Sequence, residues 1–168
     1  TGSMATGLLI RKRTNPDTPD ATRSSTDYII FRLGEILLNY VEAAYYLGDP
    51  NGDMVSVINQ IRDRAGMPSL SLGEITEEKI RQERRCELAF EEHVFWDLRR
   101  WRIAVQELDN KRRHRLHYRF NANTETYTIE IADGDLGGVR LHPERNYYYA
   151  LGLNRLADNP KLIENPGY

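Results

Sequence analysis

The carboxylates between residues 81 and 92 form the densest group of chemically capable side chains in the sequence. Glu83, Glu87 and Glu91 are four residues apart, so they stack on one helix face, where like charges repel. Carboxylates placed in this way can hold a metal ion inside a helical bundle, or they can bind arginines from neighbouring helices. The metal sites use Glu-x-x-His pairs, and Phe90 stands where His93 would need its glutamate. We therefore interpret these carboxylates as a structural arginine–glutamate network and expect no metal or other cofactor.

Arginines that can supply this network surround the carboxylates in the sequence. The candidates are Arg62, Arg64, Arg99, Arg100 and Arg102.

Aromatic side chains are the second group, and the chemistry that they suit is the binding of sugars. A tyrosine or tryptophan ring offers a flat apolar face and a polar edge, which matches the C–H face of a sugar ring beside its hydroxyls. The chain has ten tyrosines and two tryptophans. The candidate ligand-binding residues are Tyr147, Tyr148, Tyr149 and Trp101, with Trp96 as a further candidate. The alternative for the tryptophans is burial in the core, the usual place of aromatics at helical spacing.

Other kinds of site find little support in the sequence. Residues 111–119 carry five basic side chains followed by aromatics, a pattern that can bind single-stranded nucleic acid. The formal net charge of the chain is −2, however, so we interpret the segment as a solvated linker and expect no nucleic-acid partner. No serine or cysteine lies in a nucleophile motif. The single cysteine, Cys86, is expected to be a small buried side chain, and we expect no catalytic residues.

Two helices joined by a short turn are predicted upstream of these groups. A helical period runs from Asp27 to Gly48 and a second from Asp53 to Gly66. The short turn between them predicts an antiparallel αα-hairpin. The residues expected to face inward are Ile30, Leu33, Leu37, Tyr40, Val41, Ala44 and Leu47 on the first helix and Met54, Val57, Ile58, Ile61 and Ala65 on the second. The opposite face of the first helix carries Arg32, Glu35, Asn39 and Glu42.

The rest of the chain predicts more helix, then a change to strand. A third helix is expected from about Thr76 to about Glu92, and residues 95–108 are expected to form a fourth helix or to continue the third. A period of two around residues 116–120 and 127–131 predicts a β-hairpin with its turn at 121–125. The last 22 residues are expected to pack over the helices as an irregular tail. Residues 7–12 suggest a short strand and residues 14–25 a loop.

Five segments in a fixed order resemble the C-terminal part of the SusD/RagB family of outer-membrane glycan-binding lipoproteins. The matching segments are residues 32–43 (RLGEILLNYVEA), 58–68 (INQIRDRAGMP), 83–91 (ERRCELAFE), 96–101 (WDLRRW) and 165–168 (NPGY). After the glutamate that ends the third of these segments the family often has glycine, where this chain has Glu92.

The resemblance implies a mostly α-helical fold with tetratricopeptide-like helix pairs, a small β-hairpin and an irregular C-terminal tail. Residues 1–4 are interpreted as a remnant of an expression tag, and residues 5–168 as the C-terminal domain of a longer chain. The resemblance also indicates that several charged residues are structural rather than ligand-binding. This structural motif comprises Glu83, Arg84, Glu87, Glu91, Asp97, Arg99 and Arg100.

For function, the resemblance implies that the protein binds oligosaccharides at the bacterial surface and passes them to a SusC-like TonB-dependent transporter. It implies no catalysis, and membrane attachment only through an N-terminal lipid anchor that is absent from this chain. The alternative, based on the αα-hairpin alone, is a helical-repeat adaptor that binds other proteins.

Overall fold

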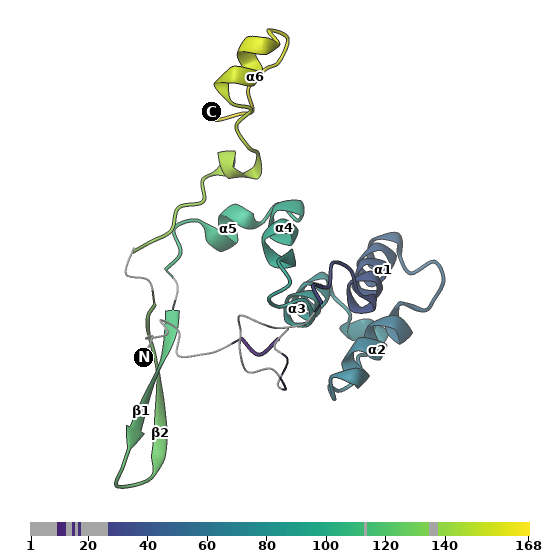
Figure 1. The fold of residues 1–168 in the computed structure, drawn as a ribbon. Helices are drawn as coiled ribbons and strands as arrows, with labels where there is room; N and C mark the ends of the chain where they lie inside the picture. The colour runs from purple at the N-terminus through teal and green to yellow at the C-terminus, as the bar shows by residue number, and fades with distance from the viewer. Residues whose placement is uncertain (1–9, 13–14, 16, 18–26, 113, 135–137) are drawn as a thin grey trace. The chain divides into compact units, whose positions relative to one another are not determined.

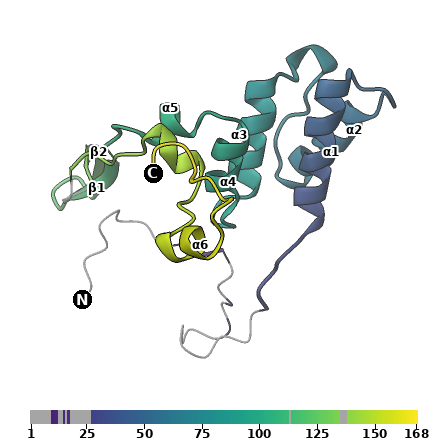
Figure 2. The same cartoon turned by 90° about the horizontal axis from the view of Figure 1, so that it is seen from above.

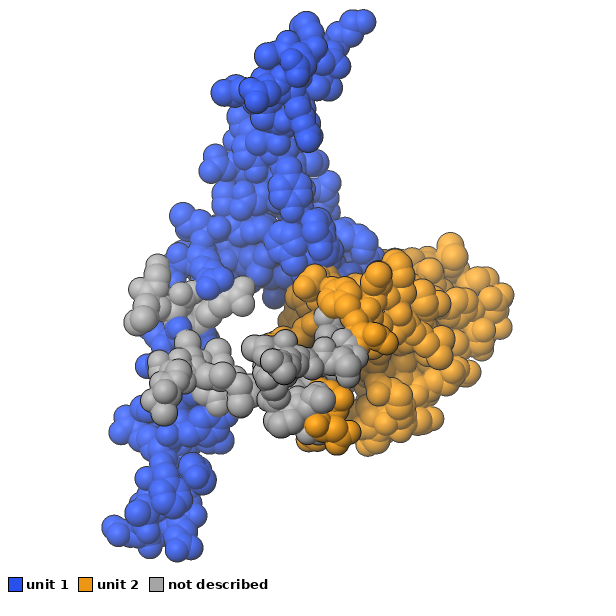
Figure 3. All heavy atoms as spheres, in the orientation of Figure 1, with its two compact units in different colours: residues 1–9, 95–168 blue, residues 10–94 orange. Residues whose placement is uncertain are grey.

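The structure is a computed structural model that describes residues 10–12, 15, 17, 27–112, 114–134 and 138–168. It is mostly α-helical with one two-stranded antiparallel sheet (Figure 1), which confirms the predicted fold class. Residues 10–94 form one compact unit, and residues 95–168 make up most of a second (Figure 3). The interpretation of residues 1–4 as a tag remnant and the strand predicted at residues 7–9 lie outside the described residues. Residues 10–12 are not in a strand.

The first unit is built on the predicted αα-hairpin. Helix α1 (Leu33–Leu47) and helix α2 (Met54–Arg64) lie side by side (Figures 1 and 2), joined through Gly48, whose φ of +74° ends α1. Asp53 precedes α2 as predicted, but its carboxylate accepts the Tyr40 hydroxyl instead of capping the helix. The tetratricopeptide likeness of this pair stays a prediction. The main core cluster consists of Val41, Ala44, Met54, Ile58, Leu70, Ile75 and Ile80.

Helix α1 differs from its prediction in both its start and its buried face. It begins at Leu33, not at Asp27, because Arg32 is extended and its guanidinium is held by Glu87 at the end of α3 and by Glu91 after it. Leu33 and Leu47, predicted to face inward, are 70% and 74% exposed. The helix instead buries Glu35 and Glu42 together with Leu38, Val41 and Ala44. A polar–apolar pattern assigns acids to the surface, so it fails where a buried acid has a partner, as Glu35 has in His93.

Helix α3 (Glu77–Glu87) begins where predicted, with the Thr76 hydroxyl accepting the Lys79 N–H at 3.2 Å. It follows a short 3₁₀ helix, η1 (Leu72–Glu74), and packs against α1. It ends five residues before the predicted Glu92, because Phe90 and Glu92 adopt left-handed φ values of +61° and +67°. The prediction for Cys86 was wrong: its side chain is exposed.

The single helix predicted over residues 95–108 is two helices. These are α4 (His93–Arg100) and α5 (Ala104–Leu108), separated by Arg102 at a φ of +59°. The β-hairpin is confirmed: β1 (His114–Asn121) pairs with β2 (Thr126–Asp133), and Tyr118 lies opposite Ile129. The C-terminal segment contains the 3₁₀ helix η2 (Glu144–Tyr147) and the short helix α6 (Leu153–Asp158), so it is less irregular than predicted.

The core of the first unit gives a conservative test of its packing. Ile58 is fully buried, so Ile58→Val should lower the free energy of unfolding by about 1 kcal/mol through one lost methyl group. Urea unfolding followed by circular dichroism measures the change. Ile36→Val is the matched control, because Ile36 is 52% exposed and the same deletion there should cost much less. Equal losses at the two positions would contradict this core assignment.

Candidate functional site

The carboxylates singled out in the sequence are bound by cations from three separate segments. Arg32 Nε donates to Glu91 Oε2 at 2.7 Å, and Arg32 Nη1 donates to Glu87 Oε1 at 2.6 Å. Arg64 Nη2 reaches Glu87 Oε2 at 2.6 Å, and Lys12 also pairs with Glu91. The side chains of Glu87 and Glu91 are only 8% and 7% exposed. This Arg32 network therefore ties the residue before α1 and the end of α2 to the last residue of α3 and the turn that follows it.

Two further contacts extend this arrangement along α3. Arg62 Nη1 donates to Glu83 Oε2 at 2.5 Å and its Nε donates to the Pro68 carbonyl at 2.8 Å. The buried Arg84 donates to Asn39 Oδ1 at 2.6 Å. Among the residues that the structure describes, no three histidine, cysteine or acidic side chains could together hold a metal ion.

Only some of the five arginines predicted to bind these glutamates do so. Arg62 and Arg64 do, whereas Arg99 and Arg102 contact tyrosines. Arg100 pairs with the buried Asp97 at 3.1 Å. The sequence reasoning missed Arg32, which it assigned to the outward face of a helix. The signal that was available is its place at the head of the first motif, 55 residues before Glu87.

The Arg32 network also sets the acid–base behaviour of Glu91. Burial alone would raise the pKa of this carboxyl, but hydrogen bonds from Arg32 and Lys12 outweigh burial and hold the pKa at about 2. The same contact with Glu91 raises the pKa of Arg32. Glu91 is therefore ionised at neutral pH and stays so below the range in which a glutamate usually takes up its proton.

This pKa predicts a loss of stability in acid. A carboxyl whose pKa is lower in the folded than in the unfolded chain stabilises the fold above the unfolded value, and that stability disappears as the pH falls toward the folded value. Between pH 7 and pH 3, Glu91 should contribute a loss of about 2 kcal/mol. Urea unfolding of the wild type and of Glu91→Gln at both pH values measures it. The variant should lose less stability than the wild type; identical losses would contradict the assignment.

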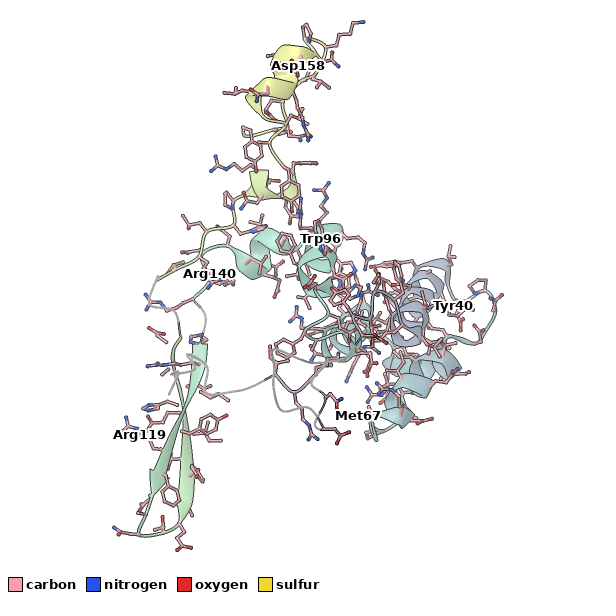
Figure 4. The ribbon with its side chains drawn as sticks, in the orientation of Figure 1. Tyr40, Met67, Trp96, Arg119, Arg140 and Asp158 are labelled. Carbon is pink, nitrogen blue, oxygen red and sulfur yellow. The ribbon has the colours of Figure 1, made fainter. Side chains whose placement is uncertain are left out.

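In the second unit, Arg99 lies against three aromatic rings. Its guanidinium carbon is 5.3 Å from the ring centres of Phe95 and Trp96 and 4.7 Å from that of Tyr149. We call Phe95, Trp96, Arg99 and Tyr149 the Arg99 aromatic cluster; Trp96 is labelled on α4 in Figure 4. Cation–π contacts of this kind hold the rings in place. The rings nevertheless stay open to solvent: Trp96 is 55% and Tyr149 62% exposed.

The three predicted tyrosines are held in place by α4, by the turn between α4 and α5, and by the C-terminal segment. Arg99 donates to the Tyr147 carbonyl at 2.5 Å, and Arg102 Nη2 lies 3.2 Å from the Tyr148 hydroxyl. Asn165 Nδ2 donates to the Tyr149 carbonyl at 2.7 Å. The tyrosine run is thus fixed by side chains both before and after it in the sequence.

The two tryptophans lie in different surroundings. Trp101, the predicted candidate, is half-buried with the Arg100 guanidinium 5.2 Å from its ring centre. Trp96, the weaker candidate, is the more exposed and belongs to the Arg99 aromatic cluster. A ligand that stacks on aromatic rings would therefore find Trp96 and Tyr149 together.

A groove of about 600 Å³ in the same unit borders the cluster through Phe95. This volume falls within the range of roughly 300–1,000 Å³ usual for small-molecule sites. His142 packs edge-on against Phe95, and its backbone N–H donates to Asp109 at 2.6 Å. The groove is lined by Phe95, Glu107, Leu108, Lys111, Arg112, Arg140, Leu141 and His142.

Comparison with known proteins places this helical fold in a family. The sequence model of the SusD family matches residues 1–168, so the chain belongs to the SusD family. The resemblance found in the sequence motifs is thereby confirmed. SusD-like protein P38 of Formosa agariphila is 28% identical over 154 residues, which cover 85% of this chain and 25% of that protein.

Solved structures of similar proteins agree. A SusD-like protein of Bacteroides fragilis, BF3747, matches with a TM-score of 0.67 and 34% identity, over 85% of this chain and 26% of that one. The structure named BT4246 matches with a TM-score of 0.69 and 29% identity, over 86% of this chain and 24% of that one. The chain thus spans about a quarter of the length of these relatives. No helix in the described ranges is long and apolar enough to cross a membrane.

Proposed function

We propose that this chain is part of a protein that binds glycans at the bacterial outer surface and passes them to a SusC-like TonB-dependent transporter. The observation that carries the proposal is the Arg99 aromatic cluster, whose rings are exposed although they are fixed, in a chain of the SusD family. In this proposal, the full-length protein is attached to the outer membrane through an N-terminal lipid anchor. The protein captures and hands over its ligand without making or breaking a bond.

The geometry of the cluster suits a sugar chain. The exposed faces of Trp96 and Tyr149 offer two apolar platforms, and cation–π contact with Arg99 orders both before a ligand arrives. A ring that is already ordered loses little side-chain entropy on binding. Arg99 Nη1 is buried without a hydrogen-bond partner among the described residues, which leaves a donor beside the platforms.

A panel of oligosaccharides tests the proposal. The purified chain is titrated with neutral, carboxylated and sulfated tetrasaccharides, and intrinsic tryptophan fluorescence is followed, because Trp96 is one of only two tryptophans. Saturable binding of at least one glycan is expected. Absence of binding to every glycan, by both the chain and the full-length protein, together with failure of the full-length protein to co-purify a transporter, would overturn the proposal.

A further inference from the structure

The groove beside Phe95 has more positive than negative side chains in its lining. Lys111, Arg112 and Arg140 line it, and Glu107 is its acidic lining residue. The chain as a whole has a formal net charge of −2, so this excess is local. A groove whose lining charges are mostly of one sign raises the local concentration of ligands of the opposite charge.

Several of these polar groups are open to a ligand. The Lys111 side chain is exposed, and no ion pair of its ammonium occurs within the described ranges. Arg112 pairs with Asp133 at 2.6 Å, but these side chains are 45% and 58% exposed, and pairs in water contribute little. A ligand anion can therefore compete for Arg112.

His142 provides an independent sign of an unfilled site. Its Nε2 atom is buried without a hydrogen-bond partner in the described part of the chain. Buried polar atoms in native proteins are nearly always paired, and an unpaired one requires an explanation. Its ring packs edge-on against Phe95, and Asp109 holds its backbone by accepting the backbone N–H. The atom is therefore a positioned hydrogen-bonding group at the groove wall.

Phe95 links this groove to the Arg99 aromatic cluster, because it belongs to both. We propose that the groove binds the negatively charged substituent, a carboxylate or a sulfate ester, of a sugar ring adjacent to those on Trp96 and Tyr149. The inference rests on the proposed glycan-binding function and adds the class of glycan: acidic rather than neutral. Arginine and lysine supply charge-assisted hydrogen bonds to such groups, and these are stronger than bonds between neutral groups.

Calorimetric titration with three matched probes tests the proposal. The probes are a neutral galactotetraose, a tetragalacturonate and a sulfated galactan tetrasaccharide. At about 50 mM salt, where charge screening is weak, at least one acidic probe should bind tenfold or more tightly than the neutral one. A preference for the uronate or the sulfate identifies which anion the groove accepts. Equal affinity for all three would overturn the acidic-glycan inference and leave the proposed function standing.

Substitutions in the groove locate the effect. Lys111→Gln/Arg140→Gln should lower the affinity for the acidic probe tenfold or more, because two charge-assisted hydrogen bonds are lost. The affinity for the neutral probe should stay within about twofold of the wild-type value. Lys111→Gln alone should show part of this loss of affinity, and it keeps the test valid if the double variant does not fold. Lys161→Gln, at an exposed site in the same unit, is the matched control. The groove is not the site if Lys161→Gln weakens binding of the acidic probe, or if neither groove variant weakens it. If the wild type binds none of the probes, the proposed function is overturned as well.

Discussion

Arg32→Met should lower the free energy of unfolding by about 3 kcal/mol or more, because it leaves two buried carboxylates short of their main partner. Arg32 contacts Glu87 and Glu91 and also donates to the Glu87 carbonyl at 2.6 Å. Methionine keeps much of the aliphatic stem, so the loss reports the charge and the hydrogen bonds rather than the packing. Urea unfolding followed by circular dichroism measures the change.

A second arginine on the same carboxylate provides the control for this prediction. Arg64 also binds Glu87, but its side chain is 66% exposed, so Arg64→Met should cost about 1 kcal/mol or less. Arg32→Met/Glu91→Gln should recover part of the stability lost in the single variant, because the buried charge on Glu91, left with Lys12 alone, is gone. Equal losses for Arg32→Met and Arg64→Met, with no recovery in the double variant, would contradict a buried network.

Trp96→Ala should weaken glycan binding tenfold or more. Truncating a tryptophan that anchors a ligand commonly costs about 2 kcal/mol or more, and each 1.4 kcal/mol is about a factor of ten in affinity. Tyr149→Ala should act in the same direction, because its ring shares Arg99 with Trp96. Calorimetry with the best glycan of the panel measures both variants.

An exposed aromatic residue outside the cluster is the matched control. Phe120 lies on β1 in the same unit, is 56% exposed and packs against Tyr127. Phe120→Ala should leave the affinity for glycan unchanged. If Phe120→Ala weakens binding as much as Trp96→Ala does, the cluster is not the binding surface.

Local signals in the sequence were enough to predict most elements of the fold. Thr76 begins α3 with a real cap, Gly48 ends α1 in the left-handed region, and alternation locates both strands of the hairpin. Each of these signals acts over a few residues. They therefore survive without any knowledge of the tertiary structure.

Features that depend on distant partners could not be predicted in this way. Glu35 and Glu42 are buried on α1, and a hydrophobic pattern places acids outside. The end of α3 depends on Phe90 and Glu92 in left-handed conformations. Glu92 was already conspicuous as the position where the family often has glycine, the residue that adopts a positive φ without strain.

The candidate site shows the same division. Tyrosine chemistry singled out residues 147–149, but their partner Arg99 lies 48 residues before Tyr147, and no local period links the two. Trp96 and Trp101 lie in the same predicted helical segment, and no local signal in the sequence distinguishes the one that contacts a ligand. Only the tertiary structure shows that Trp96 shares Arg99 with Tyr149.

The most direct test of glycan binding at the cluster is a nuclear magnetic resonance titration of the tryptophan indole N–H signals. With two tryptophans there are two such signals, and Trp96→Phe assigns them. Glycan stacking on the Arg99 aromatic cluster predicts that the Trp96 signal shifts saturably while the Trp101 signal moves little. Saturable binding that shifts Trp101 and leaves Trp96 in place would contradict the proposed site.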